Sequence, residues 1–275
     1  MNLWLAALVI AVVAAASIAA MLAVRRYVAP SGGFFTDSDR AAGVFGVVGT
    51  AFAVVLAFVI FLAFESYSNA RAEAGKEAVA VAELYYTANL FPATERRGLQ
   101  ADLICYARAV VNDEWRTMRD REPSPLVEGW ASQLEVAADA LTVETSKESE
   151  AYANWFDVNR DRLEGRRGRL AEAERFVPGL LWLVLILSAA LLLLYMCFFA
   201  DPAEPLYVQA LLIGAVAAIA TSGLLTVRFL DRPYENESGS IKPTAIERSL
   251  AAMEREWAAK AAVPPLPCGS DGERS

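Results

Sequence analysis

Residues Ala41–Phe64 read AAGVFGVVGTAFAVVLAFVIFLAF, and the chain continues as ESYSNARAEAGKEAVAVAELYYTANLF up to Phe91. The first part carries no charge and, at ~1.5 Å per residue, is long enough to cross a hydrocarbon core of ~30 Å. The second part is rich in helix-forming residues and has no proline before Pro92. This stretch predicts one continuous helix of ~75 Å that leaves a membrane and becomes the first helix of a soluble bundle.

Three further uncharged runs are Met1–Val24, Phe176–Ala200 and Pro205–Val227. Each exceeds the ~18 residues that nominate a membrane-spanning helix. Met1–Val24 has no basic segment ahead of it and is longer than the apolar core of a signal peptide, so we interpret it as a retained span. The sequence therefore predicts an all-α integral membrane protein with four transmembrane helices. A helical bundle is expected to form from extensions of spans two and three.

The polar segments divide the chain into four regions. We expect a transmembrane hairpin over 1–64, with spans at about 3–24 and 41–64, followed by a helical bundle over 65–175. A second transmembrane hairpin covers 176–230, with spans at about 176–199 and 207–228. The C-terminal segment, 231–275, is expected to contain a helix at about 244–260 and a disordered end.

Within the bundle, apolar residues at helical spacing predict helices over about 94–121 and 126–141. Thr145 and Glu148 form the pattern of a capping box at the start of the next helix. That helix is expected to run on into the third span, with a kink at Pro178.

The arginine distribution predicts the orientation. Four spans place both termini and the 65–175 segment on the same side of the membrane. Lysine and arginine gather on that side, which the positive-inside rule assigns to the cytoplasm. The residues on that side are Arg71, Lys76, Arg160, Arg162, Arg166, Arg167, Arg169, Arg175, Arg228, Arg232 and Lys242, whereas the other side has Arg25, Arg26 and Arg40.

The run from Arg160 to Arg175 allows two interpretations. Its arginines alternate with Asp161, Glu164, Glu172 and Glu174, which is typical of a solvated helix with i,i+4 ion pairs. Alternatively, the run is a basic mouth that gathers anions or contacts anionic lipid. The candidate residues are Arg160, Arg162, Arg166, Arg167, Arg169 and Arg175.

Several functional classes lack their signatures. The chain has no histidine, and its three cysteines form neither a CxxC pair nor a disulfide framework, so Cys105 is interpreted as an inert core thiol in a reducing compartment. Phosphate-loop and hydrolase motifs are missing, and Asp113-Glu114 is interpreted as part of a solvated helix face. A net charge of −8 gives no support to nucleic-acid binding. We expect no catalytic residue, no metal and no cofactor.

One face of the second span is a candidate pore lining. Alternatively, the small residues on this face form a seam at which two helices pack closely. The seam begins with Ala42 and Gly46, at the start of the span. In the pore interpretation the lining narrows to a hydrophobic neck towards the cytoplasmic end. The alternative is that the two phenylalanines of the neck pack against neighbouring spans. The candidate pore and neck residues are Thr50, Ala53, Ala57, Phe61 and Phe64.

Several short motifs occur in a characteristic order over residues 40–255. They include an apolar span followed by Glu-Ala and Leu-Tyr, a Tyr…Glu-Trp helix, an Arg-Leu helix entering a span with Pro and Trp, and an Asp-x-Pro-aromatic segment after the last span. In this order the chain resembles the bestrophin-like family of bacterial four-span membrane proteins. The matching positions include Glu77, Tyr106, Glu114, Trp115, Arg169, Pro178, Trp182, Asp231, Pro233 and Tyr234.

That family is named for its similarity to bestrophins, which are pentameric anion channels with a cytoplasmic helical domain. The resemblance implies a homo-oligomeric anion channel of the bacterial inner membrane, with five subunits if it follows bestrophins. Its partners would be the lipid bilayer, further copies of itself and small anions. The acidic cluster that binds calcium after the last span of bestrophins has no counterpart here. The rival hypothesis is a non-conducting membrane scaffold or sensor whose bundle binds a partner.

Overall fold

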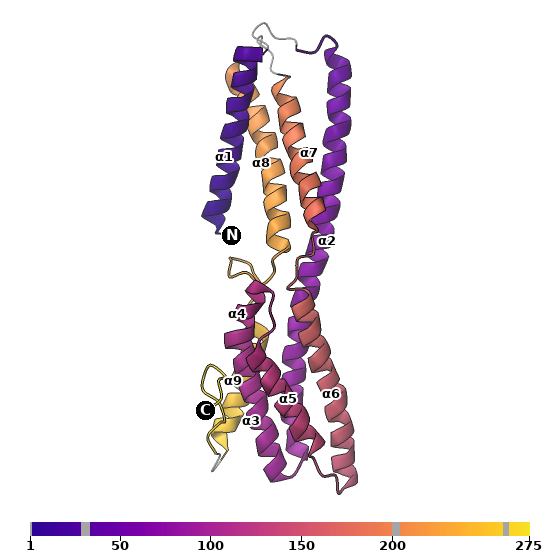
Figure 1. The fold of residues 1–275 in the computed structure, drawn as a ribbon, viewed down its shortest axis with the longest axis vertical. Coiled ribbons are helices and arrows are strands. Elements are labelled where there is room, and N and C mark those ends of the chain that lie inside the picture. The colour runs from indigo at the N-terminus through magenta and orange to yellow at the C-terminus, as the bar shows by residue number, and fades with distance from the viewer. Residues whose placement is uncertain (1, 29–33, 200–203, 261–263) are drawn as a thin grey trace. The chain divides into compact units, whose positions relative to one another are not determined.

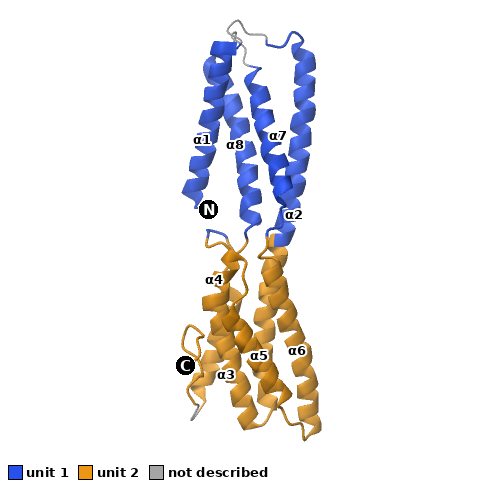
Figure 2. Ribbon diagram, viewed as in Figure 1, with its two compact units in different colours: residues 1–66, 175–232, 237–239 blue, residues 67–174, 233–236, 240–275 orange. Residues whose placement is uncertain are grey.

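The computed structural model of the chain describes residues 2–28, 34–199, 204–260 and 264–275 (Figure 1). Throughout this part the regular elements are helices, which confirms the predicted all-α fold class. Contacts divide the chain into two compact units (Figure 2). Unit 1 consists of Met1–Ser66, Arg175–Arg232 and Glu237–Gly239, and unit 2 of Tyr67–Glu174, Pro233–Asn236 and Ser240–Ser275.

Four helices among the described residues are long and apolar enough to cross a membrane. They are α1 (Leu3–Ala23, continued by the π-turn η1, Val24–Val28), α2 (Ser38–Thr87), α7 (Gly179–Cys197) and α8 (Leu206–Leu230). Helix α2 is unbroken over 50 residues, which corresponds to ~75 Å and confirms the continuous helix predicted from Ala41 onward.

Unit 1 is held together by apolar contacts among these helices. Phe52, Leu56 and Val59 line the side of α2 that joins a buried cluster with Leu185 and Leu192 of α7. A second cluster joins α1, α7 and α8 through Met21, Cys197 and Ile213. One side of α2 is thus committed to packing within the chain.

The predicted extension of span three into the bundle is wrong. Helix α6 (Ser146–Ala171) ends before α7 begins, and the residues between them are not helical. Pro178 caps α7 because it lacks a backbone N–H and disfavours helical geometry at the residue before it. The backbone N–H of that residue, Val177, donates instead to the Asp231 carboxylate at 2.8 Å.

Unit 2 is a helical bundle around a large apolar core. Besides part of α2 and all of α6 it contains the 3₁₀ turn η2 (Ala88–Leu90), α3 (Ala93–Ala109), the π-turn η3 (Val110–Glu114), α4 (Trp115–Thr117), the 3₁₀ turn η4 (Met118–Asp120), α5 (Pro125–Asp139) and α9 (Thr244–Ala259). The capping box is confirmed: the Thr145 hydroxyl accepts from Glu148 N at 3.2 Å, and the Glu148 carboxylate accepts from Thr145 N at 3.0 Å.

The last residues of the chain are ordered against unit 2, so the predicted disordered end is wrong for residues 264–275; residues 261–263 lie outside the described part. Cys268 forms a disulfide with Cys105, and the Trp130 indole donates to Gly272 O at 2.8 Å. Cys105 is therefore not an inert thiol. The two cysteines are 163 residues apart, so no local spacing could predict the pairing.

Helices α2 and α6 approach each other closely at Gly165. A Cβ built there would lie 2.6 Å from the backbone nitrogen of Glu77, which cannot move without shifting α2. We expect Gly165→Ala to lower the free energy of unfolding by ~1–3 kcal/mol, the range typical of overpacked sites. Gly98, on an exposed part of α3 with nothing within 4 Å of a built Cβ, provides the matched control.

Because alanine favours helix over glycine, Gly98→Ala should be neutral or stabilise the protein by up to ~1 kcal/mol. Denaturant unfolding of both full-length variants in the same detergent measures the difference. Equal stability of the two variants would contradict the close approach at Gly165.

Candidate functional site

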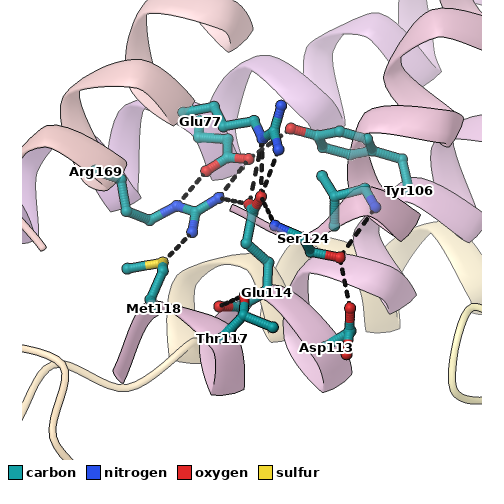
Figure 3. Close-up of polar contacts among 10 residues, drawn as sticks. Glu77, Tyr106, Asp113, Glu114, Thr117, Met118, Ser124 and Arg169 are labelled. Atoms are coloured by element: carbon teal, nitrogen blue, oxygen red, sulfur yellow. Dashed lines mark hydrogen bonds and ion pairs between the residues drawn. The ribbon is translucent and has the colours of Figure 1, made fainter. Parts of the chain in front are cut away.

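The guanidinium of Arg169, on α6, is fully buried in unit 2. Its Nε donates to Glu77 Oε2 at 2.6 Å, and its Nη2 donates to Glu77 Oε1 at 3.1 Å and to Glu114 Oε2 at 2.5 Å (Figure 3). The side chains of Arg169, Glu77 and Glu114 are 0%, 1% and 0% exposed. One arginine thus joins α6 to α2 and to the turn η3.

Neighbouring groups complete the hydrogen bonding of both carboxylates. Arg166 donates from Nη2 and Nε to Glu114 Oε1, at 2.5 and 3.0 Å. The Tyr106 hydroxyl donates to Glu77 Oε1 at 2.7 Å, and the backbone N–H of Ser124 donates to Glu114 at 3.3 Å. Saturating the acceptors in this way is what allows a carboxylate to remain charged away from water.

Arg162 adds a third buried guanidinium from α6. Its Nε donates to Asn159 at 2.8 Å, and its charge lies 4.9 Å from the centre of the Tyr106 ring. Among the described residues its two terminal nitrogens have no hydrogen-bond partner. With three arginines and two glutamates, the buried cluster carries one positive charge in excess.

The local helix geometry places Glu114 inside the bundle. Glu114 lies in η3, a π-turn between α3 and α4, and its neighbours Val110 and Trp115 are buried with it. Such wide turns interrupt the α-helical hydrogen-bond pattern and often occur at functional sites. The Trp115 ring lies 5.1 Å from the Arg169 guanidinium, which stabilises the cation further.

The electrostatics of the cluster keep Glu114 and Arg169 charged. Burial by itself raises the pKa of Glu114, but the charges and hydrogen bonds of Arg169 and Arg166 outweigh it, so the net pKa shift is downward. Burial lowers the pKa of Arg169, and Glu77 and Glu114 more than reverse this, so its pKa is raised. Burial raises the pKa of Tyr106, which therefore stays a neutral donor.

Both interpretations of the arginine run are wrong for three of its six members. Arg162 and Arg169 are fully buried, and Arg166 is 12% exposed, so these side chains are neither a solvated face nor an open basic mouth. Arg160, Arg167 and Arg175 are exposed, and Arg160 pairs with Asp157 at 3.1 Å. The interpretation of Glu114 as a solvated residue is wrong for the same reason.

The candidate pore face of α2 is exposed in the single chain. Phe61 and Phe64 are 63% and 58% exposed, so neither packs against another span of the same chain. Thr50 is also exposed, and its hydroxyl donates to the carbonyl of Gly46 at 2.8 Å. Ala42, Gly46, Ala53 and Ala57 share this exposure.

The remaining motif positions stabilise chain connections. In unit 1 Asp231 and Pro178 fix the start of α7, and Trp182 packs partly buried against the apolar cluster. In unit 2 Tyr234 stacks edge-on against Trp115 at 5.6 Å and donates to Ala70 O at 2.9 Å. The Pro233 carbonyl accepts from Ile241 N at 2.8 Å.

Sequence reasoning missed Arg162 and Arg166 as members of the buried cluster. It also missed Ser124 and Met118, whose sulfur accepts from Arg169 Nη1 at 2.6 Å. A signal was available for the arginines, because positions 162, 166 and 169 are spaced four and three apart and share one helix face. For metal ligation, no group of three His, Cys, Asp or Glu side chains suitable for an ion occurs within the described part of the chain.

This arrangement defines a class: an all-α membrane protein whose four candidate spans accompany a helical bundle with a buried arginine–glutamate cluster. The model of the Bestrophin-like domain matches residues 6–246, so the chain belongs to the Bestrophin-like family. No curated protein matches it.

Solved structures similar to this chain include mutant forms of a bacterial Bestrophin homolog from Klebsiella pneumoniae. One has a TM-score of 0.65 at 18% identity, covering 88% of this chain and 97% of that one. Another has a TM-score of 0.66 at 16% identity, covering 92% and 98%. A structure of this homolog solved by Zn-SAD phasing gives 0.63 at 17% identity, covering 89% and 96%. At these identities the similarity concerns the fold.

The buried cluster predicts a large cost for removing its central cation. Arg169→Met leaves Glu77 and Glu114 without their shared partner, and we expect a loss of ~3–5 kcal/mol in the free energy of unfolding. Arg167→Met removes an exposed charge two residues away and should change stability by less than ~0.5 kcal/mol. Thermal unfolding of both full-length variants measures the contrast, and similar stabilities would argue against a structural role for the cluster.

Proposed function

We propose that this chain is a subunit of an oligomeric anion channel in the bacterial inner membrane. Membership of the Bestrophin-like family supports this proposal, as do four candidate spans without an ionisable residue in their interior. The observation that carries it is the exposed face of α2. That face leaves large apolar side chains without a partner in their own chain, so another copy, lipid or a pore must adjoin them.

The side chains along this face suit a hydrophobic gate. Thr50, Ala53 and Ala57 leave space, and Phe61 and Phe64 follow them along the same helix. In a ring of subunits these phenylalanines would form narrow apolar bands. Such constrictions close a channel by excluding water and need no charge.

The exposed arginines of the run would attract anions towards the proposed channel. Arg167 and Arg175 remain available to raise the local concentration of anions, whereas Arg160 is exposed but paired with Asp157. Arg160 and Arg167 belong to unit 2 and Arg175 to unit 1, and each would act within its own unit. The other three arginines of the run are occupied inside unit 2 and are not part of the proposed basic mouth.

We place both termini in the cytoplasm, on the strength of the arginine asymmetry. The Cys105–Cys268 disulfide favours the opposite orientation, since such bonds persist mainly in oxidising compartments. A reporter that is active only in the periplasm distinguishes the two orientations when it is inserted after Lys260, with the rest of the chain retained. We expect it to be silent; activity would place unit 2 in the periplasm.

Ion flux in liposomes containing the purified protein tests the channel directly. We expect anion flux from the wild type and greater flux from Phe61→Ala/Phe64→Ala, because the neck is widened. Phe58 is also 62% exposed but lies ~100° around the helix from Ala57 and ~120° from Phe64, so Phe58→Ala is the matched control and should change flux little.

The oligomer must remain intact in both variants for this comparison. Unchanged flux in an intact double variant would remove this face from the pore. If the wild type itself carries no anions, the rival proposal of a non-conducting scaffold or sensor is favoured.

A further inference from the structure

A small cavity of about 260 Å³ opens on unit 2, and one of its lining residues, Trp115, also contacts Arg169 of the buried cluster. One side is formed by residues of η3, α4 and η4, and the other by Tyr234, Asn236 and residues 241–243. At this size it is smaller than the ~300–1,000 Å³ of sites for drug-sized ligands. It suits a single compact polar group with a short substituent.

The inner wall of the cavity is fixed by aromatic and backbone contacts. The Trp115 indole donates to Ile241 O at 3.1 Å, and Tyr234 stacks against the Trp115 ring. Trp115, Tyr234 and Ile241 are 6%, 3% and 7% exposed. The apolar part of the site is therefore formed before any ligand arrives.

The rim of the cavity is strongly cationic. Arg116, Arg119 and Lys242 line it, and its lining includes no carboxylate. Arg116 pairs with Asp113 at 2.6 Å, whereas Lys242 donates only to the neutral amide of Asn236, at 2.5 Å. Within the described residues Arg119 has no ion pair. Two positive charges thus remain uncompensated on a chain whose net charge is −8.

We infer that this cavity binds a phosphate group. Guanidinium groups match phosphate oxygens in a bidentate fork, and a lysine ammonium adds a point charge. The wall of Trp115 and Ile241 would contact the apolar substituent of the phosphate. Two sources share this chemistry: the headgroup of an anionic phospholipid and a free phosphate or phosphate monoester. Tyr234 follows the end of the last candidate span by only four residues along the chain, so a lipid headgroup is a natural source.

The test compares both sources on the full-length protein. In one arm inorganic phosphate and glycerol phosphate are titrated into detergent-solubilised protein at constant ionic strength, and binding is measured by calorimetry. In the other arm native mass spectrometry counts phosphatidic acid and phosphatidylglycerol retained against phosphatidylcholine. Binding does not require ion conduction, so this test is independent of the flux experiment.

The variant Arg119→Gln/Lys242→Gln removes the two uncompensated charges. The control Lys147→Gln/Arg255→Gln removes two exposed charges elsewhere on unit 2, so both variants have the same net charge. We expect at least tenfold weaker binding in the first variant and unchanged binding in the control. If the first variant retains less anionic lipid in the mass spectrometer, the cavity is a headgroup site. If it binds phosphate more weakly in the calorimeter, the cavity is a site for free phosphate.

Two outcomes would overturn the inference. The first is a wild type that binds neither free phosphate at millimolar concentration nor anionic lipid in preference to phosphatidylcholine. The second is equal weakening by the two double variants, which would indicate non-specific charge attraction. Since all four substituted side chains are exposed, both variants should fold, and their thermal unfolding provides the check.

Discussion

Unit 2 depends on two ion pairs, which join Arg169 to Glu77 and to Glu114. Moving such charges out of water costs several kcal/mol per ion, and the cost is recovered only when every oxygen and N–H finds a partner in good geometry. The cluster therefore tolerates little displacement of α6 relative to α2. Gly165 and Gly168 permit the necessary approach, because a Cβ at either position would lie 2.6 Å from atoms of α2.

This constraint has a consequence for α2 itself. The helix carries Glu77 in unit 2 and, further towards its N-terminus, packs Phe52, Leu56 and Val59 within unit 1. Both contacts engage the same helix, and neither covers Phe61 or Phe64. The remaining face of α2 is left free for other molecules, which is the feature that the channel proposal uses.

Sequence reasoning succeeded where the determining signal is local. Uncharged runs predicted the spans, the absence of helix breakers predicted the length of α2, and Thr145 with Glu148 predicted a cap that the structure contains. The resemblance to the bestrophin-like family also selected Glu77, Tyr106 and Glu114, which converge in space.

Prediction from the sequence failed where a side chain's interaction partner lies far away in the chain. The arginines of α6 alternate with acidic residues, so their sequence is typical of a solvated helix. The carboxylates that pair with Arg169 lie 92 and 55 positions away in the chain, where no local pattern reveals them. The disulfide joins residues 163 apart. The break between α6 and α7 depends on Asp231, 54 residues beyond Val177, which supplies the acceptor that a helix would otherwise provide.

We propose that further copies of the same chain assemble around the free face of α2, so that Phe61 and Phe64 line a shared pore. The mass of the purified protein in a mild detergent, corrected for bound detergent and measured at micromolar concentration, tests it most directly. We expect a closed homo-oligomer, with five subunits if the chain follows the bestrophins. A clean monomer would contradict it, because four spans with so few polar residues cannot enclose a hydrated pore alone.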